Sequence, residues 1–241
     1  MYEILGAPHF WVGLLEIIGV NVLLSGDNAV VIALAARSLP AGQRARAVLL
    51  GSVAAIVMRI VLTLAAAEML DLPYLKTLGA AALLWIGIRL LLPGQGKGPD
   101  APSNRTLFAA IRTILVADIV MSLDNVIAVA AAAEGDLTLL VLGLLISVPL
   151  IAFGSTLVLK LMDRFPILIA AGGALLGYVA GEMLMRETAL RPWLPPENGP
   201  WSIALPAVGA LLVVGIGKWL AGGRDEAGPQ RVIELKDGEH K

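Results

Sequence analysis

A chain of 241 residues is long enough for one or two soluble domains, but 58% of its residues are hydrophobic and only 15% are charged. The net charge of −1 gives no basic surface for nucleic acid, and the absence of cysteine excludes disulfides, iron–sulfur clusters and thiolate metal sites. The mean hydropathy is +0.83, and the apolar residues form blocks of about twenty, the length that crosses the hydrocarbon core of a bilayer. Because lipid offers no hydrogen-bond partners to the backbone, these blocks predict an all-α integral membrane protein.

Seven transmembrane helices are predicted in chain order, within a single transmembrane domain that covers residues 1–241. The N-terminal segment lacks a basic stretch and a small-residue cleavage site, so we do not expect a removable signal peptide. The predicted spans are 11–36, 45–70, 73–92, 107–133, 137–161, 166–185 and 201–220. A Gly/Pro-rich linker at 93–106 follows the third span, and a charged cytoplasmic tail at 221–241 follows the last.

The basic residues predict the orientation. If the N-terminus faces outward, only Lys76, Arg186 and Arg191 fall on the outer side, and Arg59 lies inside the second span. The remaining lysines and arginines all fall on the inner side. The positive-inside rule therefore predicts a multi-pass protein of the plasma (inner) membrane, with its N-terminus out and its C-terminus in.

An internal repeat organises the chain. NVLLSGDNAVVIALAA and DIVMSLDNVIAVAAAA share a Ser-x-Asp-Asn motif at a constant offset of 97 residues, and a Pro/Gly pattern recurs later in each half at an offset of 93. Each copy, 11–92 and 107–185, holds three spans, so the second copy crosses the membrane in the opposite sense. The pattern predicts two inverted three-helix repeats plus a C-terminal helix, an architecture of secondary transporters in which the site lies where the repeats meet.

The repeated motif places polar and acidic groups inside the membrane. Each copy has three polar residues at positions i, i+4 and i+7 of one helical face, with an aspartate beside that face. These residues are Asn21, Ser25, Asp27 and Asn28 in the first copy and Asp118, Ser122, Asp124 and Asn125 in the second. An aspartate at the centre of a membrane helix costs about 2.5–3.5 kcal/mol and usually faces a cavity or a partner. Adhesion between helices would need only the amides and hydroxyls, whereas the carboxylates add charge that must be protonated, paired or bound to a metal cation.

A hard divalent cation suits these donors. Arg59 is the buried basic residue that could neutralise one carboxylate. Oxygen ligands without imidazole or thiolate suit Mg²⁺, Ca²⁺ or Mn²⁺, and the residues do not choose among these ions. The predicted ligands are Asp27, Asp118 and Asp124 with the amide oxygens of Asn21, Asn28 and Asn125.

Other polar residues are candidates for the ion path or for coupling. They are Glu16, Arg59, Glu68 and Glu182, together with the motif serines Ser25 and Ser122. For each glutamate, a solvated position at the membrane interface is the alternative interpretation. Gly26 could loosen the first motif helix, but Leu123 stands at the equivalent place in the second copy, so a helix break common to both copies is not expected.

LLSGDNAVVIALAARSLP, the following RARAVLLG with Arg59 downstream, and AIRTILVADIVMSLDNVIAVAAAAEGD resemble the TerC family of integral membrane proteins, and within it the seven-span YjbE-type branch. The resemblance covers roughly residues 10–185. It implies metal-ion transport, chiefly manganese efflux, and in some members delivery of manganese to exported enzymes. It also implies functional roles for the aspartates and asparagines of the paired motif, and similarity to the wider LysE-like exporters implies inverted repeats.

The sequence therefore predicts a secondary transporter, not an enzyme, that exports a hard divalent cation by alternating access, with manganese as the cation that the resemblance implies. The chain has no nucleotide-binding motif, so proton antiport is the expected coupling. The cation is a substrate, no cofactor is expected, and the predicted partners are the metal ion and the lipid bilayer; no oligomeric partner is predicted. The alternatives are an intramembrane aspartyl protease, a non-transporting protein that hands metal to partners, and a LysE-like exporter of a cationic metabolite.

Overall fold

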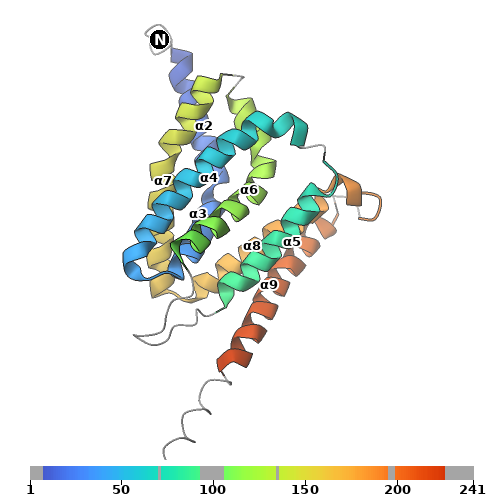
Figure 1. Ribbon diagram of the computed structural model, residues 1–241. Helices are drawn as coiled ribbons and strands as arrows, with labels where there is room; N and C mark the ends of the chain where they lie inside the picture. Colours follow the sequence, from blue (N-terminus) through green and yellow to red (C-terminus); the bar gives the residue numbers. More distant parts are fainter. Residues whose placement is uncertain (1–7, 70–71, 93–105, 134–135, 195–198, 226–241) are drawn as a thin grey trace, which may run out of the picture.

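The computed structural model describes residues 8–69, 72–92, 106–133, 136–194 and 199–225 (Figure 1). Within these residues the chain is all-helical, with eight α-helices, one short 3-10 helix and no strand, as expected for an all-α membrane protein. The elements are α2 (Pro8–Leu24), α3 (Gly26–Arg37), α4 (Ala41–Met69), α5 (Leu75–Leu91), α6 (Leu107–Ala132), α7 (Leu137–Arg164), α8 (Ile167–Met185), η1 (Thr188–Leu190) and α9 (Trp201–Asp225).

A helix lies at each predicted span, and four of the described helices are long and apolar enough to cross a membrane: α4, α7, α8 and α9. The pair α2 and α3 makes a fifth, bent span. By contrast, α5 has only 17 residues, and α6 contains the acidic motif and Arg112. Apart from residue 106, the predicted linker lies outside the described residues, as does the tail beyond residue 225. The helix at the predicted last span, α9, continues to Asp225, and its candidate membrane span is Trp201–Gly222.

The helices form two groups. The first group contains α2, α3, α4, α6 and α7, and the second contains α5, α8 and α9 (Figure 1). The groups meet where α5 packs against α6 and where α3 packs against α8. Both copies of the acidic motif lie in the first group, on α2–α3 and α6.

Glycines allow close contacts between the two halves of the chain, and each half supplies one glycine and one isoleucine to these contacts. A Cβ atom at Gly51 on α4 would lie 2.6 Å from Cδ1 of Ile114 on α6, and one at Gly143 on α7 would lie 2.5 Å from Cγ2 of Ile17 on α2. Ile17 and Ile114 are 97 residues apart, the same offset as the two motifs. Each half thus contributes a glycine groove that receives an isoleucine from the first span of the other half.

The third helix of each half also has a glycine that lies against a valine of the other half. A Cβ atom at Gly79 on α5 would lie 2.8 Å from Cγ1 of Val120 on α6, and one at Gly172 on α8 would lie 2.9 Å from Cγ1 of Val30 on α3. The two glycines are the pair that the sequence aligns at an offset of 93. Small residues permit this close approach of helices, which in lipid is driven by packing rather than by hydrophobic burial.

The last helix packs outside this pattern. The backbones of α8 and α9 touch where Gly177 meets Gly209 and where Gly181 meets Pro206, so a side chain at any of these glycines would strike main-chain atoms. No equivalent of α9 follows α5 among the described residues. The seventh predicted helix therefore packs backbone to backbone on α8 of the second half, and it also packs through side chains on α5 of the first half.

Candidate functional site

The first motif lies at a break in the helix. α2 ends at Leu24, α3 begins at Gly26, and the helices differ in direction by 53°. The face predicted to join Asn21, Ser25 and Asn28 therefore does not continue past Ser25. In the second copy α6 runs unbroken through its motif, so the break is not shared, as expected.

Arg59 stands at the centre of a buried polar cluster. Its side chain comes from α4 and is 1% exposed. Nη1 donates to Asn21 Oδ1 at 2.5 Å and to Ser25 Oγ at 2.6 Å, while Nε donates to Ser122 Oγ at 3.0 Å. Nη2 donates to Asp118 Oδ1 at 2.7 Å and forms an ion pair with it. The guanidinium therefore binds equivalent residues of both motif copies. Position i is Asn21 in the first copy and Asp118 in the second, and position i+4 is Ser25 and Ser122.

The ligand set predicted from the sequence divides in two around this cluster. Both carboxylate oxygens of Asp118 are engaged, because Oδ2 accepts from Ser122 Oγ at 3.3 Å. Asn21 is engaged at both ends, since its Nδ2 donates to Ser147 Oγ on α7. Asn21 and Asp118 thus hold a guanidinium in this structure, in the place where the sequence predicts that they hold a metal cation.

Asn125 is joined to the helix break. Its Nδ2 donates to the backbone carbonyl of Leu24 at 3.1 Å. That carbonyl belongs to the last residue of α2, where the break removes the usual helical donor four residues ahead. The second motif copy therefore supplies a hydrogen bond that the interrupted first copy lacks.

Asp27 and Asn28 lie just beyond the break, in the first turn of α3. Asp27 Oδ1 accepts from the backbone N–H of Asn28 at 2.8 Å, and Asp27 forms no ion pair with any described residue. Asn28 is only 3% exposed, yet neither its Oδ1 nor its Nδ2 has a hydrogen-bond partner among the described residues. A buried amide without partners costs about 1–3 kcal/mol, so this one calls for a ligand.

The remaining predicted positions are not gathered around Arg59. Glu16 is exposed on α2, whereas Asn21 on the same helix is fully buried. Glu182 is half-buried near the end of α8, in the other helix group. Asp124 lies on α6 and Glu68 on α4, but the side chains of both lie outside the described part of the chain.

The structure adds residues that the sequence analysis missed. Ser147 hydrogen-bonds Asn21, and the signal that could have found it is the presence of two serines, Ser147 and Ser155, inside the apolar span 137–161. Ser52, two helical turns before Arg59 on α4, is 1% exposed, and its Oγ has no hydrogen-bond partner in the part of the chain that the structure describes. Glu187, outside the spans, accepts from the backbone N–H groups of Thr77 and Ala189, both at 3.2 Å. It ties the start of α5 to the segment after α8.

The arrangement can hold a cation at a helix break. The C-terminal carbonyls of α2, the end of a helix that attracts cations, lie beside the carboxylate of Asp27 and the amide of Asn28, which has no partner among the described residues. Broken helices of this kind supply ion sites at membrane depth in transporters, because their ends carry free backbone dipoles. The charge of Asp118 is already balanced by Arg59, so the site at the break can bind a cation without sharing that carboxylate.

The comparisons with known proteins identify the family. The model described as "Integral membrane protein TerC family" matches residues 6–224. The chain belongs to the TerC family. It is 43% identical over 205 residues to "Uncharacterized membrane protein YjbE" of Bacillus subtilis (strain 168), which covers 85% of this chain and 93% of that protein. It is 27% identical over 190 residues to "Uncharacterized membrane protein YceF" of the same strain, covering 75% and 74% of the two chains. No solved structure matches the chain.

The resemblance inferred from the paired acidic motif is thus confirmed. In this TerC-family chain the matched residues contain both motif copies, Arg59 and all the described helices except the last residue of α9. A multi-pass membrane protein, rather than a soluble one, follows from the family and from the apolar helices together.

Proposed function

We propose that this protein is a secondary transporter that exports a hard divalent metal cation, foremost manganese, across the plasma membrane. The observation that carries the proposal is the buried amide of Asn28, which has no hydrogen-bond partner among the described residues and lies beside Asp27, a carboxylate without an ion pair among them, at a helix break. Manganese is proposed because the family resemblance implies it. A hard ion is proposed because all the donors are oxygen atoms.

The ligands in contact with the ion are Asp27 and Asn28 from the first motif and Asp124 and Asn125 from the second. The side chain of Asp124 lies outside the described residues. Asp124 is included among the ligands because it is equivalent to Asp27 in the repeat. Asn21 and Asp118, the other two residues of the predicted set, position Arg59. This division is supported by the complete hydrogen bonding of Asn21 and Asp118 and by the unmet hydrogen bonding of Asn28.

Charge balance follows from that division. The Arg59–Asp118 pair is neutral as a unit, so Asp27 and Asp124 present two negative charges to the ion. A divalent cation neutralises both carboxylates. When it leaves, two protons restore neutrality, which makes the exchange of one metal ion for two protons electrically silent.

The membrane arrangement proposed here is seven spans, with α2–α3 as one bent span, two inverted repeats and α9 as the seventh. The reciprocal contacts of Gly51 with Ile114 and of Gly143 with Ile17 support a two-fold relation between the halves. An odd number of spans in each half then inverts the second copy. The basic loops favour an outer N-terminus and an inner C-terminus. Alternating access is then the movement of the second helix group, α5, α8 and α9, against α3 and α6, the motif-bearing helices of the first group on which it packs.

The decisive experiment reconstitutes the purified protein alone in liposomes with an acidic interior and measures uptake of labelled Mn²⁺. We expect uptake that depends on the pH gradient and is unchanged when potassium and valinomycin clamp the membrane potential. A protein that only hands metal to partners would give no flux in this system. Flux that follows the membrane potential would contradict the two-proton balance.

An exporter of a cationic metabolite is less well supported. Such a substrate needs an apolar or aromatic wall beside the carboxylates, but neither 12–36 nor 109–133 contains an aromatic residue. Adding lysine or arginine in excess to the same liposomes separates the two functions. Neither amino acid should compete with Mn²⁺.

A further inference from the structure

Asn28 carries a hydrogen-bond donor that a metal ion cannot satisfy. Its side chain is 3% exposed, and neither amide atom has a hydrogen-bond partner among the described residues. In the proposed site the cation takes the amide oxygen as a ligand, but the amide NH₂ group is a donor only. A buried donor without an acceptor is unfavourable. Bound metal therefore accounts for one end of this amide, and the other end needs an acceptor that the described residues do not provide in this conformation.

The equivalent residue of the second motif copy shows what such a donor can bind. Asn125 lies 97 residues after Asn28, and its Nδ2 donates to the backbone carbonyl of Leu24 at 3.1 Å. At the same offset the residue equivalent to Leu24 is Met121. The same contact made by the first copy would join Nδ2 of Asn28 to the backbone carbonyl of Met121.

The two carbonyls differ because only one helix is broken. In a continuous helix the carbonyl of Leu24 would accept from the backbone N–H of Asn28, four residues ahead. That N–H donates instead to Asp27 Oδ1 at 2.8 Å, which leaves the Leu24 carbonyl to Asn125. By contrast, α6 runs unbroken through Met121, whose carbonyl is used by its own helix. The missing acceptor of Asn28 thus has the same cause as the missing break in α6.

We propose that the helix break alternates between the two motif copies, an inference that rests on the proposed alternating access. In the other conformation α2 and α3 form one continuous helix, in which the carbonyl of Leu24 accepts from the N–H of Asn28. α6 then breaks at Ser122, and the freed carbonyl of Met121 accepts from Nδ2 of Asn28. Besides binding the ion, each asparagine of the pair therefore holds the break open in the opposite copy, in one conformation only.

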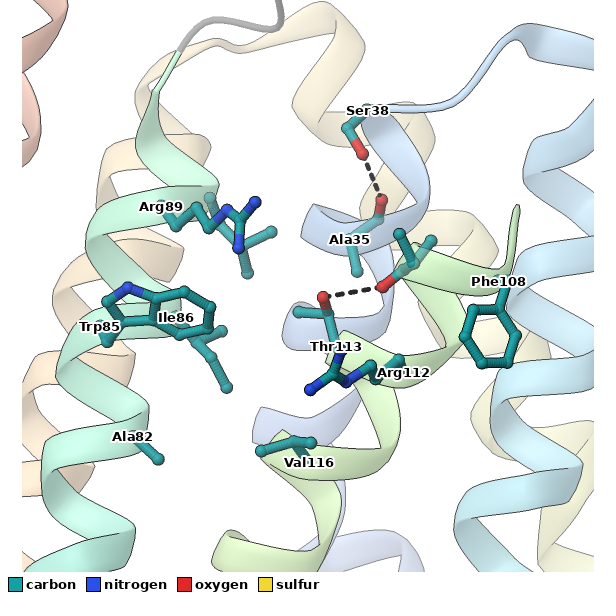
Figure 2. Close-up of a pocket in the computed structure, with 13 residues that line it drawn as sticks. Ala35, Ser38, Ala82, Trp85, Ile86, Arg89, Phe108, Arg112, Thr113 and Val116 are labelled. Atoms are coloured by element: carbon teal, nitrogen blue, oxygen red, sulfur yellow. Dashed lines mark hydrogen bonds between the residues drawn. The ribbon is translucent and has the colours of Figure 1, made fainter. Parts of the chain in front are cut away.

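A cavity between α5 and the ends of α3 and α6 leaves room for this change (Figure 2). It has a volume of about 380 Å³. Ala35 and Ser38 line it from the end of α3, beyond the present break, and Phe108 and Val116 line it from the part of α6 before Ser122. These are the two segments whose directions change when the break moves. Both can therefore shift relative to α5 into space that the described side chains leave open.

Two distances report the two breaks. The chain has no cysteine, so spin labels can be attached at introduced cysteines without background. One pair is placed at Leu15 and Pro40, on either side of the present break, and the other at Phe108 and Ala128 on α6; all four residues are exposed. Straightening the 53° bend should lengthen the first distance by about 3 Å, and an equal bend in α6 should shorten the second by a similar amount.

Double electron–electron resonance on the full chain in nanodiscs measures both populations, with Mn²⁺, with EDTA at neutral pH and in acid. We expect the fraction with the long first distance to equal the fraction with the short second distance in each condition. Gly26→Ala should raise both fractions, up to about fivefold, because alanine favours a helix interior over glycine and a Cβ atom at Gly26 meets nothing within 4 Å. Gly19→Ala, with the same open space but within α2, is the matched control and should change neither.

The asparagine variants separate this role from ion binding alone. Asn125→Leu loses the bond to Leu24 and should raise the fraction with continuous α2–α3 about fivefold, whereas Asn28→Leu cannot bind Met121 and should lower it by a similar factor. Shifts of the same sign in both variants would overturn the proposal, and so would an α6 distance that stays fixed in every condition and variant. No measurement involves metal flux. Mn²⁺ transport without exchange of the break would refute this inference alone, and exchange of the break without transport would refute only the proposed function.

Discussion

Arg59 and Asp118 form an ion pair at 2.7 Å, and their side chains are only 2% and 6% exposed. The pair joins α4 of the first half to α6 of the second. A buried charge is tolerated only when it is paired and hydrogen-bonded, and Arg59 meets both conditions through four acceptors. The pair therefore neutralises one of the three motif carboxylates and also ties together the helices that carry them.

Removing either partner should destabilise the protein strongly. Arg59→Gln and Asp118→Asn should each lower the free energy of unfolding by about 3–5 kcal/mol, because each leaves an uncompensated buried charge. Chemical unfolding in detergent micelles measures the loss. Arg44→Gln is the control: it breaks the Arg44–Asp163 pair, whose side chains are 28% and 47% exposed, and should cost at most about 1 kcal/mol. Equal losses at the two pairs would contradict a stabilising role for the buried one.

The residues at the helix break should behave in the opposite way. Asp27→Asn should abolish Mn²⁺ flux in liposomes while the unfolding midpoint stays the same or rises, because Asp27 has no ion-pair partner to lose among the described residues. Asp163→Asn, a carboxylate of the exposed pair, should keep full flux. An Asp27→Asn variant that transports as well as the wild type would exclude this aspartate as a ligand.

The unpartnered amide gives a second, sharper comparison. Asn28→Leu has a similar volume and removes two unsatisfied polar atoms, so the thermal midpoint should be maintained or raised while Mn²⁺ flux is lost. Ser52→Ala is the matched control, since Ser52 is also buried without a hydrogen-bond partner among the described residues but lies outside the motif. It should be equally stable and retain its flux. Retained flux in Asn28→Leu would show that the amide has a structural role only.

The glycine grooves should tolerate no methyl group where a branched side chain fills them. Gly143→Ala would set its Cβ 2.5 Å from Cγ2 and 2.9 Å from Cβ of Ile17, so it should lower the free energy of unfolding by about 1–3 kcal/mol. Gly19→Ala, on α2 with open space around it, should be neutral or stabilising. Ile17→Ala should partly rescue Gly143→Ala. An undiminished stability of Gly143→Ala would mean that the helices separate without cost.

The selectivity of the site follows from its oxygen donors. Without imidazole or thiolate it forfeits the affinity that Zn²⁺ and Cu²⁺ gain from softer ligands, and Mg²⁺ gives up its waters more reluctantly than Mn²⁺. In competition experiments Mn²⁺ flux should persist in excess Mg²⁺. Ca²⁺ should compete only if the site accommodates more than six ligands. Strong inhibition by Zn²⁺ with none by the hard ions would refute the ligand assignment.

Glu187 should make stability depend on pH outside the membrane. Burial raises its pKa, but backbone N–H groups, those of Ala189 and Thr77 among them, outweigh that effect and hold the pKa below its ordinary value. Its carboxylate therefore stabilises the fold above its ordinary pKa, and this stabilisation is lost as the pH falls through the lowered value. The difference in thermal midpoint between the wild type and Glu187→Gln should be constant near neutral pH and vanish in acid. A difference independent of pH would refute this.

Much of the architecture could be predicted, since long apolar blocks in lipid can only be helices. The paired motif showed in advance that the two halves of the chain carry related segments. Arg59, the basic residue inside a predicted span, was the expected partner of one aspartate, and in the structure it pairs with Asp118. The break at Ser25 could not be predicted, because Gly26 alone does not bend a helix and Leu123 argued against a shared feature. The sequence also did not show that Asn21 would have its hydrogen bonds filled by protein groups while Asn28 would not. The Nδ2 of Asn21 donates to Ser147, which lies 126 residues away in the chain, and no local sequence pattern encodes such a contact.

The presence of a single helix α9, with no counterpart after α5 among the described residues, has a consequence for the symmetry of the molecule. Two halves that were perfect copies would make the outward-open and inward-open conformations mirror each other, with equal populations in the absence of gradients. Here α9 has no counterpart after α5 among the described residues, and the helix break occurs in the first motif copy alone, so the two halves are not equivalent. If the protein works by the proposed alternating access, its two empty conformations should therefore differ in free energy, and one of them should be the more populated.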